Sequence, residues 1–265
     1  MVGPFTNIVK RKIVLGILAA AFAAVFVFSG IQVFIVLREY KEADVVYEQL
    51  QKEFVVVAPT QTTEADISVP DQPVVETSGI TVDFAKLTAR NADVIGWLYC
   101  ADTPINYPVV QAKDNDKYLH AGLDGKYLRS GTLFVDYRND AIGEDRQFIV
   151  YGHSMKNKTM FGSLMGYKKQ EYYEAHPVLY YLTPDAEYRI ELFAGCVMKV
   201  PQIIYQPNPG TAEYADYLAE MRSKSTFHSD VVVTPEDAVV VLSTCSYEFD
   251  NARYVALGKL VKIEK

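Results

Sequence analysis

Three residues whose chemistry suits thiol acyl transfer stand at the ends of short apolar runs. Cys245 ends the run AVVVLSTC, Arg253 immediately precedes the run YVALGKLVKI, and His153 directly follows QFIVYG. A thiolate is a nucleophile, an imidazole gives and takes protons, and a guanidinium can stabilise an oxyanion or hold a substrate backbone. Brought together, these three side chains predict covalent catalysis by a cysteine.

The interval between Cys245 and Arg253 has a geometric explanation. If the two apolar runs are strands that pair antiparallel, the end of one lies beside the start of the other, and the residues between form a loop. His153 joins them only if its strand ends at the same edge. At pH 7 and ordinary pKa values, roughly 1% of molecules would hold thiolate and imidazolium together. A nearby Arg253 should raise that fraction by favouring the thiolate.

Short apolar runs separated by turn residues fill most of the chain beyond Trp97, a pattern typical of strands. About eight can be recognised: WLYC, INYPVV, GTLFVDY, RQFIVYGH, VLYYLT, YRIELFAGCVMKV, AVVVLSTC and YVALGKLVKI. They predict an all-β core, either an antiparallel sandwich or a small closed barrel.

Two stretches have a helical pattern instead. The segment VDFAKLTARNADVIGW, ahead of the strands, suits a short helix pair. The segment Thr211–Phe227 predicts an amphipathic helix that packs on the β core, because its apolar residues recur at helical spacing: Tyr214, Tyr217, Leu218 and Met221.

The segment from Ile13 to Leu37 has no charged residue. As a helix it spans about 37 Å, enough to cross a hydrocarbon core of about 30 Å with some tilt. A cleaved secretory signal is the alternative, but its apolar part is shorter and ends in a polar cleavage region. Three cations, 10–12, precede the segment, whereas the cations after it alternate with acids. This asymmetry predicts a cytoplasmic N-terminus and an extracellular remainder.

These features divide the chain into four parts. Residues 1–12 are predicted to be cytoplasmic, 13–37 a transmembrane signal anchor, 38–79 a juxtamembrane helix and stalk, and 80–265 the catalytic domain. Within the third part, Ala58 to Gly79 is rich in Pro, Thr and acids, which is typical of a linker.

Composition excludes several classes of function. The net charge of -7 and the lack of a basic cluster beyond residues 10–12 argue against a nucleic-acid partner. Three cysteines do not make a disulfide framework, and Cys100 and Cys196 lie inside apolar runs, as core residues do. No metal-ligand spacing is present, and no cofactor is expected.

On these motifs the sequence resembles the sortases, the membrane-anchored cysteine transpeptidases of Gram-positive bacteria. LSTC matches the nucleophile motif with Cys245, YGHSM carries the histidine as His153, and ARYV carries the arginine as Arg253. The resemblance covers about Ile80 to Glu264 and is closest to class B, on the opening DFAKLTARNADVIGW, the segment TPINYPVVQAKDNDKYL and the inserted helix. It implies a closed eight-stranded barrel with N-terminal helices and a helix between strands six and seven.

The resemblance also implies substrates and a substrate groove. The substrates would be secreted proteins with a C-terminal sorting signal, NPxTx-like or related, cleaved after Thr. The acyl acceptor would be a peptidoglycan cross-bridge amine or, alternatively, a pilin lysine. Positions matching the class B groove are Asn115, Leu119 and Ser243, to which Thr244 is added.

Three questions stay open in the sequence. Glu248, Asp250 and Asp136 are each candidates for an acid that assists the histidine. A cell-wall cysteine peptidase that uses water would have the same nucleophile and would want an Asn or Asp to orient its imidazole. A tethered binding module with an inert cysteine is the non-enzymatic alternative.

Overall fold

The computed structural model describes residues 4–57, 77–199 and 205–264. The chain forms two compact units, Met1–Ala43 and Asp44–Lys265. Most of the expected stalk and the first half of the loop Val200–Gly210 lie outside the described residues. The second unit begins N-terminal of Ile80, where the sequence places the start of the catalytic domain.

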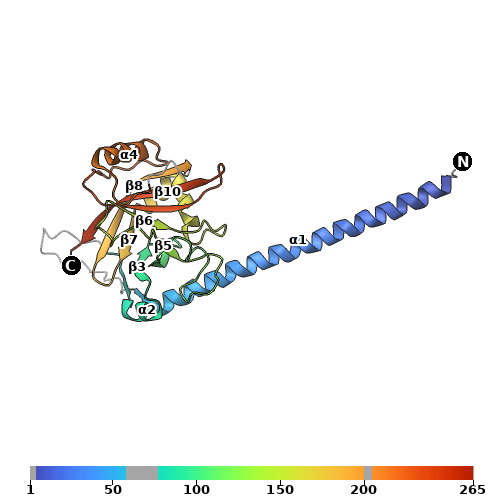
Figure 1. Cartoon of the computed structure of the whole chain (residues 1–265), viewed down its shortest axis with the longest axis horizontal. Helices are drawn as coiled ribbons and strands as arrows, with labels where there is room; N and C mark the ends of the chain where they lie inside the picture. Colours follow the sequence, from blue (N-terminus) through green and yellow to red (C-terminus); the bar gives the residue numbers. More distant parts are fainter. Residues whose placement is uncertain (1–3, 58–76, 200–204, 265) are drawn as a thin grey trace, which may run out of the picture. The chain divides into compact units, whose positions relative to one another are not determined.

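The first unit is helical. Its described residues belong to α1 (Pro4–Phe54), one uninterrupted helix (Figure 1). Within the described residues, the part of this helix from Lys12 onward is the one span with the length and composition to cross a membrane. Its large apolar side chains between Ile13 and Leu37 are mostly exposed, as the lipid-facing residues of a membrane helix are.

The last turns of α1 belong to the second unit. Tyr47, Leu50 and Phe54 are buried there, and the Tyr47 hydroxyl donates a hydrogen bond to the Gly131 carbonyl. The chain then forms β1 (Val55–Val57), which pairs antiparallel with β2 (Ile80–Val82).

A single helix stands where the sequence predicts a helix pair. Helix α2 (Phe84–Arg90) begins after Asp83, whose carboxylate accepts a hydrogen bond from Lys86 N at 3.1 Å, an N-cap. The second half of the predicted pair is strand, because β-branched Val94 and Ile95 favour extended backbone. Gly96 lies directly against the ring of Tyr181, where a side chain would collide.

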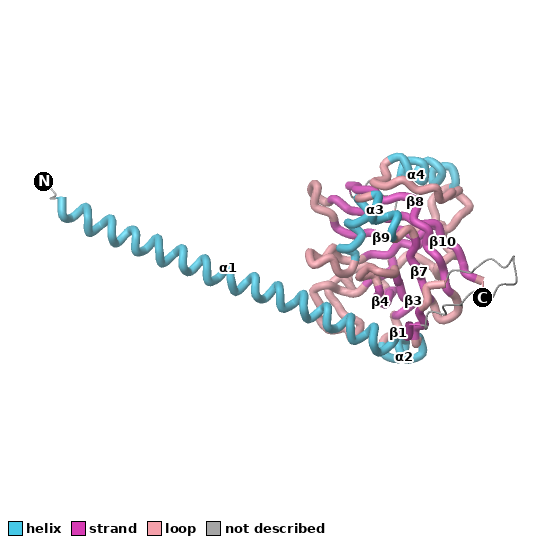
Figure 2. The backbone as a smooth tube through the Cα atoms, turned by 180° about the vertical axis from the view of Figure 1, so that it is seen from behind, coloured by secondary structure: helices cyan, strands magenta, loops and turns pink. Residues whose placement is uncertain are grey.

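Eight strands close into a barrel, in the order β10-β8-β7-β3-β4-β5-β6-β9 (Figures 1 and 2). Each overlaps one predicted apolar run; they are β3 (Val94–Tyr99), β4 (Asn106–Gln111), β5 (Leu133–Val135), β6 (Gln147–Tyr151), β7 (Val178–Leu182), β8 (Glu187–Lys199), β9 (Val239–Cys245) and β10 (Ala252–Ile263). The closed barrel is confirmed. Two of its pairings, β4 with β5 and β6 with β9, are parallel.

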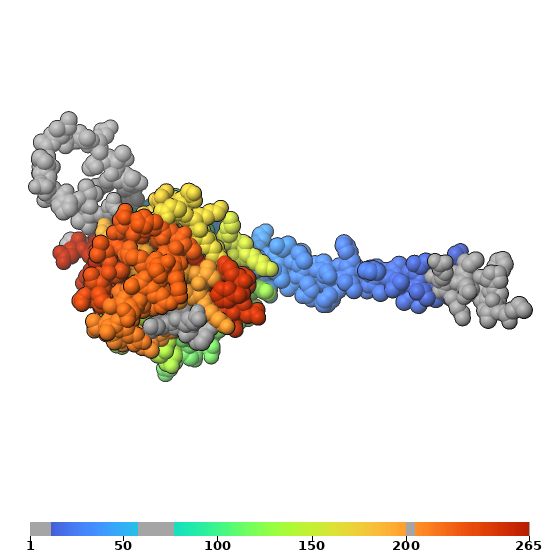
Figure 3. Space-filling model, turned by 90° about the horizontal axis from the view of Figure 1, so that it is seen from above, coloured from blue at the N-terminus to red at the C-terminus, as the bar shows by residue number. Residues whose placement is uncertain are grey.

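The helices within the barrel sequence lie outside the strands. Between β6 and β7 come η1 (Phe161–Lys168) and α3 (Gln170–Ala175). Helix α4 (Thr211–Ser223) is inserted between the sixth and seventh barrel strands, packs on β8, and covers much of one face of this unit (orange in Figure 3). Its buried residues are the four predicted from spacing: Tyr214, Tyr217, Leu218 and Met221. They join a core cluster with β6, β8, β9 and β10.

Candidate active site

A hairpin places Cys245 beside Arg253. Strands β9 and β10 pair antiparallel, and Arg253 is the register partner of Cys245. Partners in an antiparallel pair project to the same face of the sheet with their Cβ atoms about 5 Å apart. The loop between them is tight: Ser246 N donates to the Ala252 carbonyl at 2.9 Å, and Asn251 adopts a positive φ of 61°, which Asn tolerates better than most residues. The predicted adjacency of thiol and guanidinium is present.

A parallel pairing brings His153 to the same rim. Strand β6 pairs with β9 in parallel, with Tyr151 opposite Ser243. Two bonds extend this pairing beyond the end of β6, from Gly152 N to the Ser243 carbonyl at 3.2 Å and from the Thr244 hydroxyl to the Gly152 carbonyl at 2.7 Å. Continued two residues beyond Tyr151 and Ser243, the same register sets His153 opposite Cys245.

Gly152 makes this approach possible. A Cβ at this position would collide with the side chains of Leu133 and Phe161. Only glycine lets the chain leave β6 this close to the barrel wall, and the next residue is His153. The glycine in YGHSM therefore has a packing reason.

His153 is held by a backbone carbonyl. Its Nε2 lies 2.6 Å from the Leu119 carbonyl oxygen. Because a carbonyl oxygen only accepts, Nε2 carries the hydrogen of this bond, which leaves Nδ1 as the nitrogen that exchanges a proton. Burial lowers the pKa of His153, a shift that the Leu119 carbonyl opposes and the nearby His120 reinforces. The exposed His120 ring stacks on His153 with their centroids 5.2 Å apart.

The candidate third acids bind elsewhere. Asp136 accepts hydrogen bonds from Arg138, Tyr151 and Asn115. Glu248 pairs with Lys168 and accepts from Ser246. Asp250 is exposed in the loop between β9 and β10. The hydrogen bond described for the imidazole of His153 is to a carbonyl, so the backbone takes the orienting role that an acid has in other thiol enzymes.

All seven predicted site residues line one cavity of about 260 Å³: Asn115, Leu119, His153, Ser243, Thr244, Cys245 and Arg253. The sequence reasoning missed four side chains of the same wall: Thr132, Phe134, Tyr151 and Tyr205. Tyr151 had a usable signal, since it is the last residue of β6 and precedes His153 by two residues. Tyr205 had none, because it follows a loop without a periodic pattern; its hydroxyl lies 2.9 Å from Ser243 Oγ.

A closed barrel with a thiol, an imidazole and a guanidinium around one cavity has the architecture of a cysteine transpeptidase. The family described as "Sortase domain" matches residues 98–261. The chain is 34% identical over 242 residues to a sortase B of Listeria monocytogenes, which covers 89% of this chain and 92% of the relative.

Solved structures agree with this match. A crystal structure of sortase B from Bacillus anthracis in complex with AAEK1 has a TM-score of 0.69 and 34% identity, covering 85% of this chain and 99% of that one. A Staphylococcus aureus sortase B–substrate complex has a TM-score of 0.65 and 31% identity, covering 68% and 85%. The chain belongs to the sortase family, and its relatives place it in class B. Members of this family are cysteine transpeptidases.

Proposed function

We propose that this sortase cleaves a sorting signal of the NPxTx type, or a related one, after its threonine and transfers the acyl group to a peptidoglycan cross-bridge amine. The observation that carries the proposal is the meeting of Cys245, Arg253 and His153 at the ends of three adjacent strands. A substrate held in the cavity that they line would meet all three groups at once.

The proposed reaction has two halves. The Cys245 thiolate attacks the threonine carbonyl, and the resulting oxyanion lies beside the Arg253 guanidinium. His153 gives a proton to the leaving amine as the carbon–nitrogen bond breaks, leaving a thioester on Cys245. An incoming amine then attacks the thioester and transfers its proton to His153, which restores the thiol enzyme.

The groove proposal rests on where the other lining residues lie. Four further residues line the same cavity as the thiol, the imidazole and the guanidinium: Asn115, Leu119, Ser243 and Thr244. Their mixture of amide, hydroxyl and apolar groups suits an extended peptide with polar and apolar side chains. The S. aureus relative is described as a substrate complex, which supports peptide binding in this fold.

A second cavity gives room for a second substrate. It measures about 620 Å³ and borders the same strand ends, through Ser154 and Met155 after the histidine and through Tyr247 after the cysteine. A transfer reaction brings a second substrate to the thioester, and we propose that the accepting amine approaches through this separate cavity.

The anchor proposal rests on α1 and its flanks. We propose that residues 13–37 cross the membrane, that residues 1–12 stay cytoplasmic and that the barrel is extracellular. The uncharged span and the preceding cations 10–12 support this orientation. In intact cells, a membrane-impermeant maleimide should then label Cys245; labelling only after lysis would reverse the orientation.

The test of the reaction uses the full-length chain in detergent and a library of xPxTx peptides, followed by intact mass. An acyl adduct that maps to Cys245 and disappears in Cys245→Ala supports the chemistry and identifies the signal. A covalent adduct in Cys245→Ala would sink the assignment of the nucleophile.

Added acceptors separate the alternatives. Formation of an amide product with a cross-bridge peptide supports cell-wall anchoring, whereas a product only with a pilin-derived lysine peptide supports polymerisation. Release of free acid at the same rate with and without amine would indicate a cysteine peptidase. Slow iodoacetamide labelling of Cys245, unaffected by changes at His153 or Arg253, would indicate an inert binding module.

A further inference from the structure

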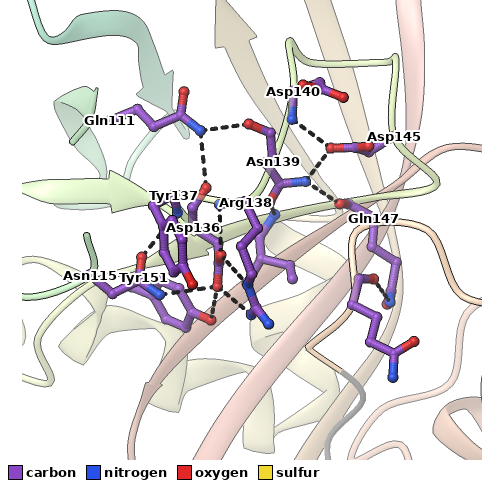
Figure 4. Close-up of polar contacts among 12 residues, drawn as sticks. Gln111, Asn115, Asp136, Tyr137, Arg138, Asn139, Asp140, Asp145, Gln147 and Tyr151 are labelled. Atoms are coloured by element: carbon purple, nitrogen blue, oxygen red, sulfur yellow. Dashed lines mark hydrogen bonds and ion pairs between the residues drawn. The ribbon is translucent and has the colours of Figure 1, made fainter. Parts of the chain in front are cut away.

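A buried carboxylate lies behind the groove, at the end of β5. Asp136 is fully buried, and its backbone N–H donates to the Ile149 carbonyl at 2.9 Å, which continues the pairing of β5 with β6 by one residue. Figure 4 shows its carboxylate at the centre of a set of converging polar side chains. Two of these, Asn115 and Tyr151, also line the catalytic cavity.

The carboxylate is saturated with donors. Oδ1 accepts from the Arg138 backbone N–H at 3.0 Å and from Arg138 Nε at 2.8 Å. Oδ2 accepts from Arg138 Nη2 at 2.8 Å, from the Tyr151 hydroxyl at 2.9 Å and from Asn115 Nδ2 at 3.2 Å. Burial alone would raise the pKa of Asp136, but these bonds, led by those of Arg138, lower it. The group is therefore an anion at neutral pH.

Asn115 has no strand to hold it, because it follows β4 in an irregular segment. Instead, both ends of its amide are bonded. Nδ2 donates to Asp136, and Oδ1 accepts from the Tyr137 backbone N–H at 3.0 Å. These two bonds fix which way the amide faces, so Asp136 determines what Asn115 can offer to a peptide in the cavity.

Tyr151 is fixed in the same way. Its hydroxyl donates to Asp136, and burial together with that negative charge raises the pKa of Tyr151 and keeps the hydroxyl protonated. Its ring contacts Tyr205, with the centroids 5.7 Å apart, and Tyr205 in turn reaches Ser243. One carboxylate therefore holds two of the side chains that line the cavity, Asn115 and Tyr151.

Stability alone does not account for this carboxylate. Apolar residues of similar volume often replace a buried ion pair without loss of stability. What an apolar residue cannot supply is an acceptor for Asn115 and Tyr151. We infer that Asp136 is a positioning residue for the peptide substrate, acting through Asn115 and Tyr151 without touching the reacting atoms. The inference rests on the proposed function of the cavity.

Asp136→Asn tests it in the full-length enzyme. The change keeps the shape but leaves one acceptor oxygen where the carboxylate has two, so the donors from Arg138, Tyr151 and Asn115 can no longer all be satisfied. KM for the sorting peptide should rise roughly tenfold with kcat changed less than about twofold, because the loss is in substrate binding and not in the chemical step. Iodoacetamide labelling of Cys245 should keep its rate. Asp237→Asn is the matched control: Asp237 pairs with Lys259 at 2.9 Å near the opposite end of β9 from Cys245, and its KM should not move.

A double-mutant cycle shows whether Asp136 acts through Asn115. In an Asn115→Ala background, Asp136→Asn should raise KM by clearly less than it does in the wild type, because the two residues share one path to the substrate. If the effects of the two substitutions on KM were fully additive, Asp136 would not act through Asn115. If KM of Asp136→Asn were no higher than KM of Asp237→Asn, the inference would be overturned. Absence of any acyl adduct in the wild type would instead overturn the proposed function.

Arg138→Gln keeps the test decisive if Asp136→Asn does not fold. Removing the guanidinium should raise the pKa of Asp136 while leaving its bonds to Asn115 and Tyr151 in place. As the pH falls, KM should then begin to increase at a higher pH than in the wild type, because protonation of Asp136 removes an acceptor. The same pH dependence of KM in this folded variant and in the wild type would contradict the positioning role.

Discussion

Strand β10 pairs with two cysteines that have very different surroundings, and their partners on β10 are two residues apart. Val255 is the register partner of Cys196 on β8, and Arg253 is the partner of Cys245 on β9. Residues two apart on a strand project to the same face, so both thiols lie on one side of this sheet. Helix α4 covers the first, whereas the second lines the catalytic cavity.

The extent of burial differs between the two thiols. Cys196 is fully buried and donates to the Met221 carbonyl of α4, with Sγ and O 3.1 Å apart. Burial raises its pKa to about 12, so this thiol stays protonated at neutral pH. Cys245 is half-buried at a strand end with a guanidinium opposite. The difference teaches that two thiols on one sheet face have different surroundings, because α4 packs over Cys196 and Cys245 stands at a strand end that lines a cavity.

The largest expected effect separates the two thiols directly. Cys245→Ala should lower turnover of the sorting peptide by at least about a thousandfold, because the nucleophile is lost. Cys196→Ala should keep turnover and lose about 1 kcal/mol of folding free energy for the small cavity it leaves. Peptide turnover and urea unfolding of both variants check this, and loss of turnover in Cys196→Ala at full stability would break the comparison.

The second largest effect on activity is expected for Arg253→Lys. Lysine keeps the charge but lacks the planar fork, so kcat/KM should fall roughly a hundredfold through weaker oxyanion stabilisation. Arg90→Lys is the control, at a surface pair with Glu53, and should leave kcat/KM unchanged. If the lysine variant were as active as wild type, a positive charge alone would suffice at this rim.

The local part of this site could be predicted from the sequence, and the long-range part could not. Cys245 and Arg253 are joined by one short loop, so strand pattern and spacing place them together. The approach of His153 to Cys245 depends on the parallel pairing of β6 with β9, which joins segments about 90 residues apart. No local pattern encodes that pairing, and only the family resemblance indicated it.

The burial of polar side chains was the other feature that the hydrophobic pattern of the sequence could not predict. Asp136 follows the apolar residues of LFVDY, and the sequence indicated it only as one of three acids that could assist the histidine. Its burial comes from tertiary contacts with Arg138, Tyr151 and Asn115. The helix α4, by contrast, was predictable because its apolar face is contained in one segment.

A smaller effect concerns acid stability and His153. Burial lowers the pKa of His153 in the folded state, so the unfolded chain binds more protons between that lowered pKa and about 6.5. Stability contributed by the neutral imidazole is therefore present above about pH 6.5 and is lost as pH falls through this window. The melting temperature should drop on acidification, by roughly 2 °C more in wild type than in His153→Gln. His228→Gln, at an exposed side chain, is the control; equal drops in all three would contradict the burial argument.

The smallest effect is expected in the loop beside the cysteine. Burial disfavours the charged form of Glu248, but hydrogen bonds from Lys168 and Ser246 outweigh it and lower the pKa of Glu248 to about 2. The ion pair with Lys168 also connects this loop to η1. The folded pKa is below the unfolded value, so this stability is present above about pH 4.5 and lost as pH falls toward 2. Because the Glu248 side chain is more than a third exposed, Glu248→Gln should cost only about 0.5 kcal/mol in urea unfolding at neutral pH.

The matched control for this loop is Glu220→Gln, which removes an exposed pair with Lys224 on α4. Both variants should keep peptide turnover within about twofold, since neither carboxylate bonds the imidazole or the thiol. A fall of more than about tenfold in Glu248→Gln alone would mean that the tie to η1 sets the position of Cys245. In that case the contrast between the two thiols would depend on the loop as well as on the strand end and the cover of α4.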